Sequence, residues 1–403
     1  MIYENGPFTW KPGTYKPVRN AWSWHHLTNV VWIDQPIGTG FSQGEVTAEN
    51  ALDVARQFMG FWKNFVDTFS LQGYKIYIAG SSYSGQWTPY VASEMLDAED
   101  QDYFDVAGTL VYNGLYGWGN LHFDVPAISY IKTWESVYGL NKSTTEQLTA
   151  ISENCGMSEY YEKYMTFPPA GTQPIDVPGY FDRNNEARPE CDLQFPLISA
   201  WGELNPCWST YNVLAHCPRA WDVNGFGEGR GEDWSPGPVY FRREDVQKAI
   251  NAPVMEDWQF CNRNVFVNGV DTLSNPGPGS MPVLPGVIDR TENVILGVGA
   301  LDSLLFGDGT LLAIQNLTFG GELGFQYPPE QRLYVPTREN SFDLQGPTGN
   351  LGTWHKERGL TYFKTRAAGH FIGKDAPSVA LRALEVLLGR VDNFSSEDPF
   401  TIS

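Results

Sequence analysis

The apolar positions of this chain follow two periods, and the order of the segments predicts an α/β fold. Short runs rich in β-branched and aromatic residues predict buried strands, and apolar residues spaced three and four apart predict amphipathic helices. Strand–helix–strand alternation is typical of a mostly parallel central sheet with right-handed crossovers and helices on its faces. The predicted strands are residues 29–34, 75–79, 104–112, 293–299 and 361–367, and the main predicted helices are 47–69, 87–96, 143–153, 242–250 and 376–388.

The alternation breaks between residues 123 and 238. This segment contains four of the five cysteines and several helical pieces, and it interrupts the strand pattern that resumes afterwards. We therefore predict a discontinuous core of residues 1–122 and 239–403, with residues 123–238 inserted as a cap that holds disulfides.

One stretch combines a strand, a tight turn and a helix around a serine. In KIYIAGSSYSGQWTPY, residues 75–90, the run KIYIA precedes a G-x-S-x-G pattern centred on Ser82, and a helical pattern follows. This is the context that a nucleophile elbow requires, since a strained turn needs glycines to push the serine oxygen out of the fold. The N-terminus of the following helix is the positive end of its dipole and would point at the negative charge that develops during a reaction at this serine. The alternative interpretation is an ordinary strand-to-helix turn.

Two further residues complete a candidate triad. Asp302 and His370 each come just after a predicted strand, as Ser82 does, and the chain order Ser, Asp, His is the one that α/β-hydrolases use. In this arrangement the histidine takes the serine proton, and the aspartate holds the imidazole in place. Asp308 is a rival for the aspartate, Asp302 being then a turn residue, and His370 could instead be a lone surface histidine.

The composition excludes several classes of function. The chain has 403 residues, a formal net charge of −20 and a pI near 4.6, which argues against nucleic acid or an anionic membrane as a partner. No run of 18 apolar residues occurs, and residues 1–5 do not resemble a signal peptide. The cysteine spacings fit no zinc pattern, so we predict neither a metal nor another cofactor.

Three glycosylation sequons and clustered cysteines favour an oxidising compartment. The sequons begin at Asn141, Asn316 and Asn393. The cysteines at 155, 191, 207 and 217 allow three pairings, among which the sequence does not choose.

The motifs ENGPFTW, NVVWIDQPIGTGFS, GSSYSG, GALD, IQNLTFGG and AGHFIGKDAP together resemble the serine carboxypeptidases, in the form common in filamentous fungi. The resemblance covers nearly the whole chain. It implies an α/β-hydrolase fold, a secreted or vacuolar location, and removal of C-terminal residues from peptides and proteins at acid pH. It also implies a triad of Ser82, Asp302 and His370, with the backbone N–H of Tyr83 as one oxyanion donor.

The sequence departs from this family in three places. The glycine-rich segment that supplies the second oxyanion donor and a carboxylate-binding asparagine would precede ENGPFTW, so we expect an impaired oxyanion hole and missing early strands. Ser81 stands where the family has a glutamate that binds the substrate carboxylate. Separately, the sequence position of Phe371, directly after the proposed base, predicts that it borders the pocket of the leaving residue. Cys261 resembles a cysteine whose partner follows the glycine-rich segment, so we expect it to be unpaired.

Three other hypotheses remain open at this point. The replacement of glutamate by Ser81 motivates an acyltransferase or esterase. The incomplete oxyanion hole motivates a non-catalytic binding protein on a hydrolase fold, since fold does not imply function. The third is a chain that does not fold stably. The sequence gives no basis for predicting the oligomeric state.

Overall fold

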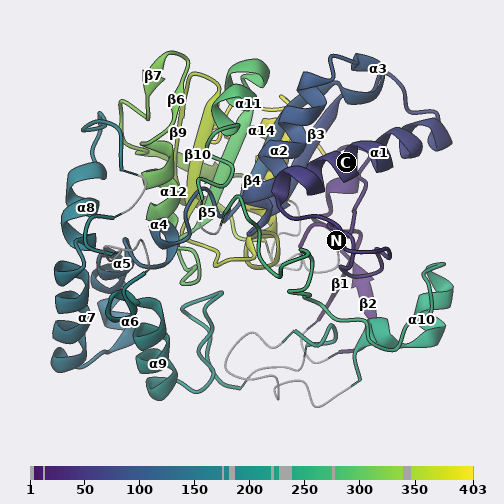
Figure 1. The fold of residues 1–403 in the computed structure, drawn as a ribbon. Helices are drawn as coiled ribbons and strands as arrows, with labels where there is room; N and C mark the ends of the chain where they lie inside the picture. The colour runs from purple at the N-terminus through teal and green to yellow at the C-terminus, as the bar shows by residue number, and fades with distance from the viewer. Residues whose placement is uncertain are drawn as a thin grey trace.

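The computed structural model describes residues 4–11, 14–174, 177–180, 187–218, 222–226, 238–274, 277–338 and 346–402. Its centre is a six-stranded sheet with the order β3-β4-β5-β10-β9-β8, drawn in the upper middle of Figure 1. The first four strands pair in parallel, whereas the β10–β9 and β9–β8 pairs are antiparallel. The predicted mostly parallel sheet is therefore confirmed. Its strands are β3 (Ile76–Ser81), β4 (Val106–Tyr112), β5 (Val294–Gly299), β10 (Leu360–Thr365), β9 (Gly349–Glu357) and β8 (Gln331–Val335).

Helices cover both faces of this sheet because the strand side chains alternate between two hydrophobic clusters. In β5, Val294, Leu296 and Val298 face the cluster formed with α1, α2 and α11, whereas Ile295 faces the cluster formed with α14. All six residues of β5 are buried, as expected for a parallel strand in the middle of a layered fold. The covering helices are α1 (Ala51–Phe69), α2 (Ser84–Asp97), α11 (Leu284–Thr291), α12 (Gly307–Ile314) and α14 (Pro377–Leu387).

Residues 123–238, the predicted cap, contain a group of helices whose hydrophobic cluster also includes Leu301, Phe306 and Leu312. Figure 1 shows these helices as a teal group at one side of the sheet. Trp201 lies at the centre of this cluster, stacked on Tyr138 with ring centroids 4.1 Å apart. The disulfides Cys155–Cys191 and Cys207–Cys217 lie in this segment, which selects one of the three open pairings. The helices are α5 (Ala127–Thr133), α6 (Glu135–Tyr138), α7 (Lys142–Asn154), α8 (Met157–Tyr164) and α9 (Gln194–Leu204).

Smaller elements connect these layers. Two-stranded hairpins precede α1 and follow α12, and short helices lie between the larger ones. They are β1 (Phe8–Trp10), β2 (Pro17–Arg19), β6 (Thr318–Phe319), β7 (Glu322–Leu323), α3 (Gln101–Phe104), α4 (Asn120–Phe123), α10 (Glu244–Ala249) and α13 (Ile372–Asp375), with single 3-10 turns at Trp24–His26, Pro189–Cys191 and Tyr240–Arg242.

The predicted strand at residues 29–34 is wrong. These residues form no strand, and their side chains line a cavity of about 520 Å³ that separates them from β3, the edge strand of the sheet. Local polar contacts hold this stretch instead. The Asp34 backbone oxygen accepts from Ser42 Oγ at 2.6 Å, and its carboxylate accepts from the Phe41 N–H at 2.9 Å. A favourable sequence pattern does not make a strand without a backbone partner beside it.

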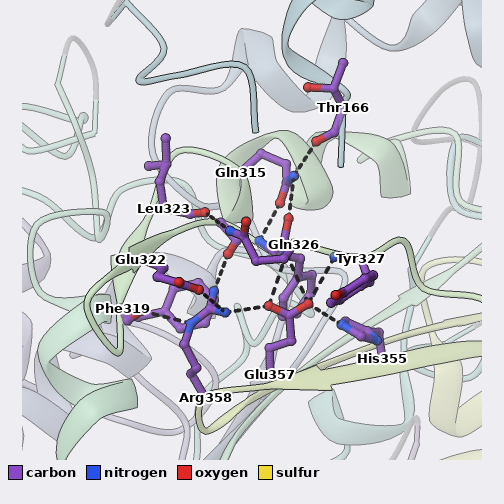
Figure 2. A network of polar contacts seen from close by, with 12 residues as sticks. Thr166, Gln315, Phe319, Glu322, Leu323, Gln326, Tyr327, His355, Glu357 and Arg358 are labelled. Carbon is purple, nitrogen blue, oxygen red and sulfur yellow. Dashed lines mark hydrogen bonds and ion pairs between the residues drawn. The ribbon is translucent and has the colours of Figure 1, made fainter. Parts of the chain in front are cut away.

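A polar network fastens the turn between β9 and β10 to the preceding hairpin. Glu357 lies at its centre in Figure 2 and accepts from His355 Nε2 at 2.6 Å, from the Tyr327 N–H at 3.1 Å and from Arg358 at 2.6 Å. Arg358 also donates to the backbone oxygen of Phe319, at 3.2 Å. Burial raises the pKa of Glu357, but these donors outweigh it and leave the pKa below its ordinary value. The carboxylate therefore stays ionised in moderate acid, which preserves the network there.

Candidate active site

Ser82 stands on a strained turn at the carboxyl end of β3. Its backbone φ is 60°, in the left-handed region that residues other than glycine rarely adopt. Two backbone bonds fix the turn, from the Ser82 N–H to the Tyr112 oxygen at 2.9 Å and from the Leu115 N–H to the Ser82 oxygen at 3.0 Å. A Cβ on Gly85 would lie 2.5 Å from the Leu115 oxygen, so this position requires glycine. The G-x-S-x-G pattern thus forms the predicted strand–turn–helix.

Tyr83 directly precedes α2 and is held by its side chain. Its hydroxyl lies 3.1 Å from Asp271 Oδ2 and 2.9 Å from Ser274 Oγ. Asp271 is buried, and its other oxygen accepts from the N–H of Ala51, at the start of α1. The Tyr83 backbone N–H lies at a helix N-terminus, where N–H groups lack intrahelical partners and suit an anion.

Asp302 and His370 form a buried pair. Asp302 is 0% exposed and His370 is 1% exposed, and Asp302 Oδ2 lies 2.6 Å from His370 Nδ1. Asp302 Oδ1 accepts from the N–H groups of Leu304 and Leu305, at 2.8 and 3.1 Å. These donors and the imidazole satisfy the carboxylate inside the protein. The rival Asp308 binds elsewhere, to Tyr161 Oη at 2.8 Å and Lys364 Nζ at 3.0 Å.

Two opposing effects act on the pKa of His370. Burial lowers it because the charged imidazolium is desolvated, while the charge and hydrogen bond of Asp302 raise it, with smaller contributions from Glu4 and Asp375. The net pKa lies above the ordinary value. The structure records no hydrogen bond between Ser82 and the His370 ring among the residues that it describes. It instead brings their backbones together through β4.

Asn113, which the sequence analysis did not single out, joins the three strand ends. It follows β4, is 1% exposed, and has φ of 43°. Its Oδ1 accepts from the Gly299 N–H at 2.8 Å, and its Nδ2 donates to the backbone oxygens of Gly369 and His370, at 3.2 and 2.8 Å. The sequence signal that could have indicated Asn113 is a polar residue that directly follows an apolar strand and precedes a glycine.

Glu4 is a second residue that sequence reasoning missed. Its Oε1 lies 3.5 Å from Ser81 Oγ, and its Oε2 accepts from the Gly373 N–H at 3.1 Å. Burial raises the pKa of Glu4, although the Gly373 bond partly offsets this effect. The only sequence signal was a carboxyl group in ENGPFTW, a motif used for recognition alone.

Aromatic side chains border the His370 ring. Phe371 meets it edge-on with ring centroids 5.3 Å apart, and Tyr211 also meets it edge-on, at 5.2 Å. Phe371 and Tyr211 stack on each other, and Phe226 packs edge-on against Phe371 at 5.8 Å. Phe371 therefore lies beside the proposed base.

No group of three or more His, Cys, Asp or Glu side chains in the described ranges is arranged to hold a metal ion. Within the same ranges, every helix is too short or too polar to cross a membrane.

These features define an α/β-hydrolase fold with serine, histidine and aspartate at one edge of the sheet. A model of the serine carboxypeptidase family matches residues 1–390. The chain belongs to this family and is a serine-type carboxypeptidase.

Curated relatives and a solved structure agree with this assignment. A probable serine carboxypeptidase of Arthroderma benhamiae is 40% identical, over 98% of this chain and 75% of the relative. Serine-type carboxypeptidase F of Aspergillus niger is 36% identical, over 97% of this chain and 75% of the relative. The crystal structure of a prohormone-processing carboxypeptidase from Saccharomyces cerevisiae superposes with a TM-score of 0.73 at 22% identity, covering 97% of this chain and 80% of that one, and supports the fold.

Proposed function

We propose that Ser82, His370 and Asp302 carry out the peptidase reaction as a catalytic triad. The observation that supports this most is the buried 2.6 Å contact between Asp302 and His370, at the same sheet edge as the strained Ser82 turn. Asp302 binds Nδ1, which leaves Nε2 of His370 to take the serine proton. Because Asp302 stabilises the imidazolium that forms, it supports proton uptake as well as ring orientation.

The reaction proceeds through an acyl-enzyme. Ser82 Oγ attacks the carbonyl carbon of the last peptide bond while its proton passes to His370. The same proton then goes to the leaving amine, the C–N bond breaks, and the C-terminal amino acid departs. Water repeats the sequence on the ester, which releases the shortened peptide and restores Ser82. The Tyr83 N–H donates to the oxyanion in both halves.

Glu4 and Ser81 form the best-supported site for the carboxylate of the substrate. A carboxyl group with a raised pKa keeps its proton at a pH where an ordinary glutamate is ionised. A protonated Glu4 can donate a hydrogen bond to a substrate carboxylate, and the Ser81 hydroxyl can donate another. This arrangement favours peptide C-termini at acid pH, and Glu4 supplies a carboxyl group beside the position where Ser81 has none.

Phe371 is proposed to border the pocket for the leaving residue. Its ring lies against His370, which must reach the leaving nitrogen, and Tyr211 and Phe226 extend the apolar surface. This surface favours apolar leaving residues over charged ones.

Labelling with an organophosphorus serine reagent tests the nucleophile. We expect one phosphoryl adduct on Ser82, loss of the adduct in Ser82→Ala, and loss of C-terminal trimming of a peptide in the same variant. An adduct that persists in Ser82→Ala would contradict the triad. Adduct formation with ester cleavage or acyl transfer but no trimming would favour an esterase or acyltransferase. No adduct, with ligand binding that Ser82→Ala does not change, would favour a binding protein.

A glycosylated protein in a secretory or vacuolar compartment is proposed from the disulfides and sequons. In Asn141, Asn316 and Asn393 the side-chain oxygen accepts a backbone hydrogen bond, at 2.8 to 2.9 Å. This bond engages the oxygen and not the nitrogen that a glycan would modify. Treatment of the native protein with an N-glycosidase should lower its mass, and an unchanged mass would reject all three sites.

A further inference from the structure

A short disulfide-closed turn in the predicted cap lies directly behind the acid–base pair. Residues 207–217, called here the 207–217 turn, are joined at their ends by Cys207–Cys217. Inside the turn, the Tyr211 N–H donates to Ser209 Oγ at 3.1 Å, and the Leu214 N–H donates to Asn212 Oδ1 at 3.0 Å. The turn is therefore tied internally as well as covalently.

One side of the turn binds the residues that flank Asp302. The Ser303 N–H and hydroxyl both donate to the Thr210 backbone oxygen, at 2.9 and 3.0 Å. The Val213 N–H donates to the Leu301 oxygen at 2.9 Å. Asp302 is thus held from both sides by the turn.

The other side of the turn binds the loop of His370. The His370 N–H donates to the Tyr211 oxygen at 2.7 Å. Asn212 Nδ2 donates to Asp375 Oδ2 at 2.9 Å, and the same oxygen accepts from the Gly369 N–H at 2.8 Å. The approach is tight, because a Cβ on Gly369 would lie 2.1 Å from the Tyr211 oxygen.

We infer that the 207–217 turn is a positioning element that sets the distance between Asp302 and His370, with Asn212 as a positioning residue. This inference rests on the proposed triad. Asp302 and His370 belong to loops after different strands, and both loops are bonded to this one turn. A displacement of about 1 Å can cost about 100-fold in rate, so an element that fixes this separation acts on catalysis without touching the substrate.

The two disulfides allow a matched comparison. Cys155–Cys191 lies in the same segment but joins α7 to the turn before α9, and its cysteines belong to the hydrophobic cluster of the cap. Cys207–Cys217 closes the turn that contacts both triad loops. Loss of either bridge relaxes the unfolded chain, but only the second should loosen the acid–base pair.

The first test compares Cys207→Ser/Cys217→Ser with Cys155→Ser/Cys191→Ser. For the 207–217 variant we expect kcat to fall about 10- to 100-fold and KM to stay within about 3-fold. Labelling of Ser82 by the organophosphorus reagent should slow in parallel with kcat. The 155–191 control should keep kcat within about 2-fold of the wild type even if its Tm falls. Equal losses of kcat in both variants, or wild-type kcat in the 207–217 variant, would overturn the inference.

The second test keeps both disulfides, so it remains decisive if a cysteine variant fails to fold. Asn212→Ala removes its bond to Asp375 and its bond from the Leu214 N–H inside the turn. We expect kcat to fall about 5- to 10-fold with KM unchanged, because only the first of these bonds, which contributes about 1 kcal/mol, reaches the loop of His370. Asp375→Asn keeps an oxygen that can accept from both Asn212 and Gly369, so its kcat at optimal pH should fall less than that of Asn212→Ala. Wild-type kcat in Asn212→Ala would contradict the positioning role.

The pH profile separates positioning from charge. Asp302, Glu4 and Asp375 all act on His370, and the charge of Asp375 raises its pKa. Asp375→Asn should therefore move the acid limb of kcat/KM to lower pH, while Asn212→Ala should lower kcat without that shift. A shift of the acid limb in Asn212→Ala with no shift in Asp375→Asn would overturn the inference. An absence of Ser82 labelling in the wild type would instead contradict the triad itself.

Discussion

The two sides of the proposed active site, the acid–base side with Asp302 and His370 and the nucleophile side with Ser82, are built differently. Asp302 and His370 are almost completely buried and are held by β4, β5 and the 207–217 turn. Ser82 is only half-buried, and it follows β3, which lies at the sheet edge beside a cavity of about 520 Å³. The imidazole needs one fixed orientation, whereas the nucleophile must meet a substrate that arrives from outside. The rigid scaffold therefore surrounds the proposed base, whereas the serine stands on a half-buried turn after the edge strand, and its neighbours Gly80, Ser81 and Ser84 line the cavity.

The largest effect on kcat is predicted for a substitution of Asp302, at the centre of the acid–base side. Asp302→Asn should preserve the fold but present an N–H to His370 Nδ1, which favours the wrong tautomer. We expect kcat to fall about 10⁴-fold, as in the comparable change in another serine protease. Steady-state kinetics on a peptide would check this result, with Asp308→Asn as the control, because Asp308 contacts Tyr161 and Lys364 instead. Comparable losses in both variants would contradict the assignment of Asp302.

The second prediction concerns Asn113, the residue that links the two sides. Asn113→Ala should leave the Gly299 N–H and the oxygens of Gly369 and His370 without their partner. Each buried group left unpaired costs about 1–3 kcal/mol. We therefore expect a clear loss of unfolding free energy, measured by denaturant unfolding, together with a fall in kcat of about 100-fold. Wild-type stability would show that Asn113 is not the link described here.

The third prediction acts on the nucleophile side and should be smaller. Glu4→Met keeps the approximate size of the side chain, removes the carboxyl group whose pKa burial raises, and offers the substrate no hydrogen-bond donor. KM for peptides with a free C-terminus should rise about 10-fold at acid pH, the cost of roughly one charge-assisted hydrogen bond. A peptide amidated at its C-terminus is the control, and its KM should not change. Equal changes for both peptides would contradict carboxylate recognition by Glu4.

The smallest effect on activity is expected at Asp124, at the end of the predicted cap nearest the core. Burial raises its pKa to about 6, although it accepts hydrogen bonds from the Leu193 and Gln194 N–H groups. Because the folded pKa lies above the ordinary value of 3.8, the associated stability is complete below about pH 3.8 and is lost as pH rises through about 6.

Asp124→Asn tests this pH dependence. Unfolding free energy of the wild type should fall by on the order of 2 kcal/mol between pH 4 and pH 7 through this group, and the variant should lack that component. Its kcat should match the wild type. Thermal or denaturant unfolding across this pH range provides the measurement, and identical pH dependence in the two proteins would reject the role of Asp124.

The sequence predicted the features that depend on local pattern. The strand, turn and helix around Ser82 form as expected, and the helix predicted at residues 47–69 is observed as Ala51–Phe69. Its start moves because Asn50 caps the helix, accepting from the N–H groups of Leu52 and Asp53. The mostly parallel order of the sheet also followed from the alternation of strands and helices. These features need only neighbouring residues to specify them.

Features that depend on distant partners were not predicted. Residues 29–34 have the composition of a strand but no adjacent backbone partner, and β8 and β9 were missed because their pairing depends on β10. Asn113 and Glu4 gain their place in the site from contacts with residues about 190 to 370 positions away in the sequence. Tyr211 was missed because its relevant group is a backbone oxygen, which side-chain chemistry does not reveal.

The position of β10 in the sheet has a consequence for biosynthesis. This strand lies between β5 and β9, yet it comes near the end of the chain, only a few residues before His370. Domains fold as units during synthesis, and long-range strand pairing is slow, so the central sheet closes only after β10 has left the ribosome. Ser82 precedes β10 by almost the whole length of the sheet-forming chain, whereas His370, the proposed base, follows it. Under the proposed triad, the topology therefore delays hydrolytic activity until β10 and the loop of His370 have been made.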